Sequence, residues 1–149
     1  MTCSPARGRL RILAVAAGGL FVAAGGAAWT AVTTQLRHED ITVPPNADLL
    51  PGRRVLGPLS AYAQAEVIKR NAERGTGGRT FADISAALRG VDGDSDEARE
   101  LRGHSASLAT AASLRTSLMT SVLAYGVSAL VAGLGTVFLV AGAQLNRKR

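Results

Sequence analysis

The hydrophobic positions of this chain are concentrated in two long segments, one near each end. The second segment, from Thr116 to Asn146, contains no Asp, Glu, Lys, Arg or His. Its apolar centre of about 23 residues would reach about 35 Å as a helix, which exceeds the ~30 Å hydrocarbon core of a bilayer. The first segment, from Ile12 to Thr34, is also uncharged and long enough to span. The pattern predicts transmembrane helices at residues 12–34 and 118–145.

The first apolar segment fits two interpretations. As a signal peptide, it has a basic start, an apolar centre and the small residues Gly26, Ala27 and Ala28 before a cleavage point at Trp29. As a retained helix or uncleaved anchor, it is long enough to cross the bilayer, and Trp29 lies where an interfacial aromatic side chain belongs. We favour the retained helix. Both interpretations place the middle of the chain on the same side of the membrane.

The middle of the chain, residues 35–117, has a mixed polar and apolar pattern. Several prolines between residues 44 and 58 predict an irregular connection, with short extended pieces at 41–43 and 54–56. Pro58 suits the first turn of a helix that continues to about Arg74. The apolar positions of this helix that we expect to form its buried stripe are Leu59, Tyr62, Ala65, Ile68 and Ala72.

Two further helices are predicted before the second apolar segment. Thr80 and Asp83 have the spacing of a capping box, followed by an apolar stripe of Phe81, Ile84 and Leu88. A helical pattern resumes at about Glu97, and no proline interrupts it before the membrane segment. The predicted fold class is therefore an all-α membrane protein. Two transmembrane helices are joined by a mostly helical extracytoplasmic segment, and the last helix is continuous with the second span.

The net charge of +6 arises at the two chain ends, because basic and acidic residues balance between Thr30 and Asn146. Positive-inside reasoning places both termini, residues 1–11 and 146–149, in the cytoplasm and residues 35–117 outside the plasma membrane. The charges of so long a loop count for little in this rule. The residues that set this topology and mark the interfaces are Arg7, Arg9, Arg11, Trp29, Tyr125, Arg147, Lys148 and Arg149.

No motif in the chain predicts an enzyme, a metal site or a cofactor. The acidic run from Asp92 to Glu97 starts like a calcium loop but lacks the Gly and Glu at its sixth and twelfth positions. The glycines at 75–78 follow a helix and lack the first Gly of a phosphate-binding loop. The two histidines, His38 and His104, have no ligand spacing. The basic excess lies at the chain ends, so we expect no nucleic-acid binding.

Small residues recur at regular spacing within both apolar segments. Such residues let helix backbones approach closely, which favours a tight helix hairpin or a homo-oligomer. An Ala- and Gly-rich composition would give the same pattern without a packing role, and both interpretations remain open. Neither segment contains an ionisable residue, which argues against a self-contained transporter. The candidate packing residues are Gly19, Ala23, Gly26, Ser128, Gly135 and Gly142, with a second stripe through Gly18, Val22 and Gly26.

Three sequence stretches, GPLSAYAQAEVIKRNAE, RTFADI and LRTSLMTSVLAYGVSALVAGLG, carry a family resemblance. The chain resembles a group of small actinobacterial two-span membrane proteins over roughly Thr30 to Gly135. Some members of that group are labelled aromatic ring-opening dioxygenases. This sequence does not support the label, because such enzymes need several His and carboxylate metal ligands. The resemblance implies architecture and location, and no catalytic residue. The matching residues are Gly57, Pro58, Ala61 to Ala65, Arg115, Ser117, Leu118, Thr120, Ser121 and Val122.

The middle segment has few large apolar residues for its length, which is little for an independent core. The sequence therefore predicts a non-enzymatic integral membrane protein whose exported segment contacts another envelope or membrane component. The alternative is a small oligomeric pore or transporter accessory subunit. The expected partners are the lipid bilayer and either a second copy of the chain or another membrane protein.

Overall fold

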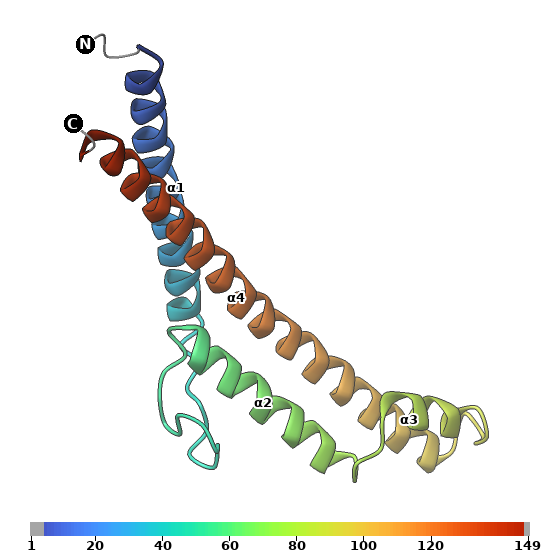
Figure 1. Ribbon diagram of the computed structural model, residues 1–149. Coiled ribbons are helices and arrows are strands. Elements are labelled where there is room, and N and C mark those ends of the chain that lie inside the picture. The colour runs from blue at the N-terminus through green and yellow to red at the C-terminus, as the bar shows by residue number, and fades with distance from the viewer. Residues whose placement is uncertain (1–4, 148–149) are drawn as a thin grey trace. The chain divides into compact units, whose positions relative to one another are not determined.

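The computed structural model describes the backbone of residues 5–147 and the side chains of residues 8–145. This part of the chain is all-α, as predicted, and its only β-type pairing is one isolated bridge between Thr42 and Arg54. The helices, shown in Figure 1, are α1 (Pro5–His38), α2 (Pro58–Gly75), α3 (Phe81–Leu88) and α4 (Asp96–Arg147).

The chain forms two compact units. One, the helix pair, contains the chain up to His38 and from Leu123 onward, that is, α1 and the C-terminal part of α4. The other, the middle unit, contains residues 39–122. The predicted continuity of the last helix is confirmed, because α4 is unbroken from Asp96 to Arg147 and contributes to both units.

Two helices are long and apolar enough to cross a membrane, over Gly8–His38 and Asp96–Leu145. Only 11% and 17% of their most apolar windows are buried within the structure. Large side chains such as Leu20 and Leu130 are 67% and 63% exposed. A core helix of a water-soluble protein would be mostly covered by protein, and these helices are not.

The middle unit begins with a hairpin-like loop. The Val43 amide donates to the Arg53 carbonyl and the Val55 amide to the Ile41 carbonyl, both at 2.9 Å. Val43 and Val55 are 0% and 1% exposed, so this loop has a small core of its own. Leu50 turns the chain with a positive φ of 51°. The short extended pieces predicted on either side of this turn are therefore present.

Helix α2 starts at Pro58, as predicted, where the Ser60 hydroxyl accepts hydrogen bonds from the Leu56 and Gly57 amides at 3.1 and 3.2 Å. The predicted buried stripe is wrong at its first two positions. Leu59 is 74% exposed and Tyr62 39% exposed. The side chains that are covered on α2 are small or medium-sized, whereas these two larger side chains project outward. The buried residues of α2 are Ser60, Ala61, Ala63, Ala65 and Val67.

The capping box of α3 is confirmed. The Asp83 amide donates to the Thr80 hydroxyl at 3.2 Å, and the Thr80 amide donates to an Asp83 carboxylate oxygen at 2.8 Å. Hydrogen bonds from the hydroxyl and then the amide of Thr80, aided by the charge of Arg79, hold the pKa of Asp83 below its usual value. Of the predicted stripe, Ile84 is fully buried but Phe81 is 54% exposed.

Candidate functional site

The helix pair is held at points where only glycine fits. A Cβ atom added at Gly18 would lie 2.7 Å from the Gly135 carbonyl oxygen, and one added at Gly135 would lie 2.7 Å from the Gly18 carbonyl oxygen. Seven residues further along α1, about two helical turns, a Cβ at Gly25 would lie 2.6 Å from the Ser128 carbonyl oxygen. Because these neighbours are backbone atoms, the two helices approach each other as closely as their main chains allow.

Polar and aromatic side chains meet at one end of this glycine contact. The Tyr125 hydroxyl lies 2.8 Å from the Thr33 hydroxyl, and Tyr125 is only 1% exposed. The Trp29 ring stands edge-on to the Tyr125 ring, with centroids 4.6 Å apart. Tyr125 thus lies between the helices, whereas the sequence suggested an interfacial aromatic. Trp29 is 41% exposed and keeps one side outward.

The structure brings together some of the predicted packing residues and not others. Ser128 is 4% exposed, and a Cβ at Gly142 would meet the Val15 side chain at 2.7 Å. By contrast, Gly19 and Gly26 have nothing within 4 Å of an added Cβ, and Ala23 is also exposed. The glycines of α1 whose added Cβ would meet α4 are Gly18 and Gly25.

A spacing match could have identified Gly25, which sequence reasoning missed. The predicted residues of α4, at 128, 135 and 142, recur every seven positions, and so do Gly18 and Gly25. Two helices that pack along their length need contact stripes of the same period. The stripe predicted on α1 through Gly18, Val22 and Gly26 instead recurs every four residues, which does not match the seven-residue period of α4.

The contacts of the helix pair also show that α1 and α4 are antiparallel. Gly18 lies against Gly135, Gly25 against Ser128, and Thr33 against Tyr125. The start of α1 and the end of α4 are therefore at the same end of the pair (Figure 1). The exposed Arg9 and Arg11 lie there. Arg7 and Arg147 are described in their backbone only, and Lys148 and Arg149 lie outside the described residues.

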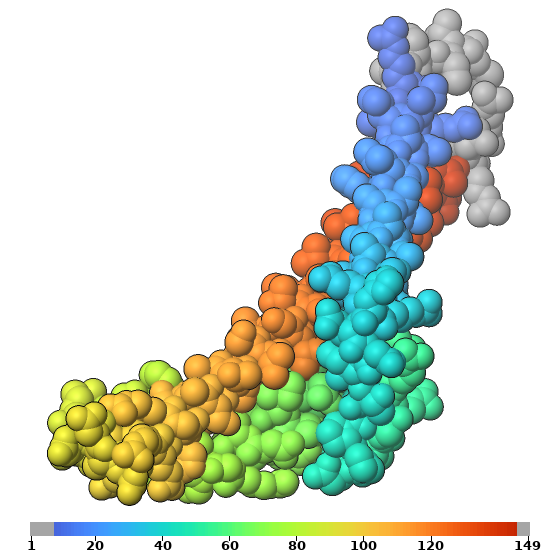
Figure 2. Space-filling view, turned by 180° about the vertical axis from the view of Figure 1, so that it is seen from behind, coloured from blue at the N-terminus to red at the C-terminus, as the bar shows by residue number. Residues whose placement is uncertain are grey.

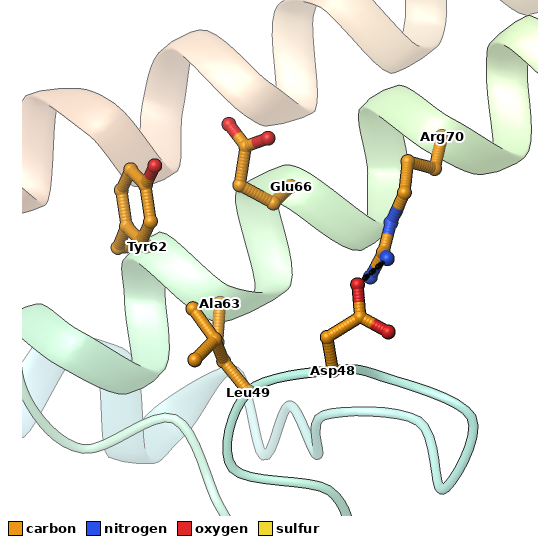
Figure 3. Close-up of a pocket in the computed structure, with 6 residues that line it drawn as sticks. All are labelled: Asp48, Leu49, Tyr62, Ala63, Glu66 and Arg70. Carbon is orange, nitrogen blue, oxygen red and sulfur yellow. Dashed lines mark hydrogen bonds and ion pairs between the residues drawn. The ribbon is translucent and has the colours of Figure 1, made fainter.

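The middle unit contains a hollow between its first loop and α2 (Figure 3). Its volume is about 260 Å³. Tyr62 and Glu66 leave successive turns of α2 in the same direction, while Arg70 reaches the loop and pairs with Asp48. Leu49 of the loop stands near Ala63, which is 2% exposed. No prediction singled out this set of residues, because the fold joins positions 48–49 to 62–70 and no sequence spacing does.

The two short motifs that resembled ligand loops have structural roles. The acidic turn before α4 is bound by arginines, since Arg102 donates to the Gly93 carbonyl at 2.7 Å and Arg99 to the Asp94 carbonyl at 3.2 Å. Gly77 and Gly78 have positive φ and end α2, where the Gly78 amide donates to the Glu73 carbonyl at 2.7 Å. Among residues 8–145, no three His, Cys, Asp or Glu side chains are placed to hold a metal ion.

Comparison with known proteins adds nothing to these observations. No family model, curated protein or solved structure matches the chain.

Proposed function

We propose that this chain is an integral protein of the plasma membrane that crosses the bilayer twice, through α1 and the C-terminal part of α4. The observation that carries this proposal is the low burial, 11% and 17%, of two windows whose mean hydropathy is 1.9 and 2.0. Water would strongly disfavour so much uncovered apolar surface, and a hydrocarbon core would not.

The antiparallel helix pair supports a hairpin with both termini in the cytoplasm. The end of the pair that contains the start of α1 and the end of α4 carries basic residues expected on the cytoplasmic side, including Arg9 and Arg11. On this proposal the middle unit lies outside the membrane. The family resemblance over roughly Thr30 to Gly135 points to the same architecture. A cytoplasmic reporter fused after Arg149 should be active, and a periplasm- or exterior-specific reporter at the same place should not.

We further propose that the middle unit binds another envelope or membrane protein and performs no reaction. The support is its uneven distribution of apolar residues. Much of the core of the middle unit is alanine and valine, while Leu59, Phe81 and Leu49 are 74%, 54% and 52% exposed. Large apolar side chains that are left outside a small core are available to contact a partner.

Site-specific photo-crosslinking in intact cells tests this role. A photoreactive amino acid in place of Leu59 should give a discrete adduct with a protein identified by mass spectrometry. The same amino acid in place of the exposed Arg89 should not give that adduct. Recovery of only uncrosslinked chain from every exposed apolar position, in correctly inserted protein, would contradict an interaction role.

The alternative is a small oligomeric pore or transporter accessory subunit. One observation favours it, namely that Gly19 and Gly26 are uncovered on α1 although small residues allow close helix contact. In a membrane two-hybrid assay, Gly26→Leu should then reduce self-association. Equal signals for Gly26→Leu and the unchanged chain would remove the basis for this alternative.

A further inference from the structure

The start of α2 carries no charged side chain, and neither does the apolar segment of α4. No Asp, Glu, Lys, Arg or His occurs between Arg54 and Glu66, or from the position after Arg115 to Asn146. Glu66 and Arg115 form an ion pair within the middle unit, with 3.8 Å between Arg115 Nη2 and Glu66 Oε1. The charged groups that border the two uncharged stretches are therefore paired with each other, and both helices become uncharged from the same level.

The two helices run in opposite directions at this ion pair. The colours of Figure 1 run toward α3 along α2 and away from α3 along α4, and Figure 2 shows α2, in green, lying against α4, in orange. Positions that precede Glu66 in α2 are thus level with positions that follow Arg115 in α4. At about 1.5 Å per residue, Leu59 lies up to about 10 Å and Tyr62 about 6 Å from the level of the ion pair, in the direction of the apolar segment.

In the proposed two-span arrangement, the length of the uncharged stretch of α4 gives the depth of this level. Residues 116–146 number 31 and are about 46 Å long as a helix, against about 40–45 Å for a bilayer with its headgroups and about 30 Å for its hydrocarbon core. Arg115 therefore lies at the outer edge of the headgroups, which form a layer of roughly 5–8 Å on each side. Tyr62 is then level with that layer, and Leu59 is level with the edge of the hydrocarbon.

The side chains at the start of α2 suit these depths. Leu59, Tyr62 and Glu66 are spaced by three and four residues, so they share one face of the helix, and Figure 3 shows Tyr62 and Glu66 pointing the same way. Leu59 is 74% and Tyr62 39% exposed. Hydrocarbon favours an aliphatic side chain over water, and the headgroup level favours tyrosine, whose ring is apolar and whose hydroxyl is polar.

We propose that the adjacent leaflet of the bilayer covers the start of α2, with Leu59 against the acyl chains, Tyr62 among the headgroups and the Glu66–Arg115 pair at their outer edge. This inference rests on the proposed two-span arrangement. Lipid is the occupant because these uncovered side chains lie level with the beginning of a segment that lipid already surrounds. The middle unit is therefore held against the membrane surface, and a protein partner that contacts Leu59 meets it there.

The accessibility of nitroxide spin labels tests this contact in the full-length protein in lipid discs. In a Cys3→Ser background, which removes the only cysteine, a label is placed in turn on Leu59→Cys, Glu73→Cys and Leu130→Cys. Oxygen concentrates in lipid and a nickel chelate in water. The label at position 59 should collide with nickel severalfold less often than the label at 73, and often with oxygen. Glu73 is the matched control, because it is exposed, lies on the same face of α2 and is about 21 Å farther from the membrane.

Leu130, which is 63% exposed in the apolar segment, distinguishes this inference from the two-span proposal. Frequent nickel collisions at 59, with a lipid-like signal at 130, would overturn the α2 contact and leave the two spans in place. Frequent nickel collisions at 130 would overturn both. Few collisions with either reagent at 59 would mean that protein covers this position, which would also overturn the inference. If the label at 59 disturbs the fold, Tyr62→Cys tests the same contact, and its nickel collision rate should also be below that at 73.

Discussion

Gly25 and Gly26 are neighbours in sequence and differ completely in what an added methyl group would meet. A Cβ at Gly25 would lie 2.6 Å from the Ser128 carbonyl oxygen and 2.8 Å from the Ala132 amide nitrogen. A Cβ at Gly26 would have nothing within 4 Å. Gly25→Ala and Gly26→Ala therefore form a matched pair that differs only in contact with α4.

The geometry sets the size of the expected effect. An ordinary Cβ contact begins at 3.4 Å, so Gly25→Ala requires the helices to separate locally by roughly 0.8 Å. A gap of about 0.5–1 Å already removes a quarter to a half of the dispersion energy of each facing atom pair. Overpacking of this kind costs about 1–3 kcal/mol. Both variants gain similar intrinsic helix stability from replacing glycine, so the difference between them isolates the contact.

Trp29 provides the measurement. It is the only tryptophan, it lies one helical turn from Gly25, and its ring is 4.6 Å from that of Tyr125. Separation of the two helices should therefore change its emission. In mixed micelles with increasing SDS fraction, Gly25→Ala should unfold at a lower SDS fraction than the unchanged chain. Gly26→Ala should unfold at the same fraction or a higher one. Equal unfolding midpoints for the two variants would refute the main-chain contact.

Two further predictions concern hydrogen bonds. Tyr125→Phe and Thr33→Val should each destabilise the helix pair by about 0.5–1.5 kcal/mol, and the double variant by less than the sum, because both remove one hydroxyl contact. SDS titration of Trp29 emission measures this double-mutant cycle, and strict additivity would contradict the contact. Thr80→Ala should lower the stability of α3 by about 1 kcal/mol at neutral pH by loss of its N-cap. Because the folded pKa of Asp83 is depressed, its contribution is present above the unfolded pKa and is lost as the pH falls through the folded pKa. The effect of Asp83→Asn on hydrogen exchange in α3 should therefore shrink at acidic pH, and a pH-independent effect would count against the capping interaction.

The sequence predicted the helices well because each has a local cause. Pro58 fixes the start of α2, the Thr80–Asp83 pair fixes the start of α3, and the lack of any proline lets α4 continue into the apolar segment. Capping and proline effects act between residues that are close in sequence. They can therefore be predicted without knowledge of the fold.

The faces of the helices were harder to predict. On α2, Ala61, Ala63 and Ala65 are buried and the much larger Leu59 is 74% exposed, so side-chain size alone did not indicate the buried face. On α1 the glycine that meets α4 is Gly25, one position before the predicted Gly26. A shift of one residue on a helix turns a side chain by about 100°, so the choice depends on the partner helix. The residues of the hollow could not be grouped at all, because only the fold brings Asp48 near Arg70.

The glycine contacts of the helix pair have a consequence for how it is held together. At Gly18, Gly25 and Gly135, an added Cβ would lie 2.6–2.7 Å from a carbonyl oxygen of the other helix. In glycine a Cα hydrogen takes the place of the Cβ, and it therefore points toward that oxygen. Such Cα–H···O contacts contribute about 0.5–1 kcal/mol each. They belong to the main chain, so substitutions on the outward faces of either helix leave them intact. The outer surface of the pair can therefore diverge freely in sequence while its pairing persists.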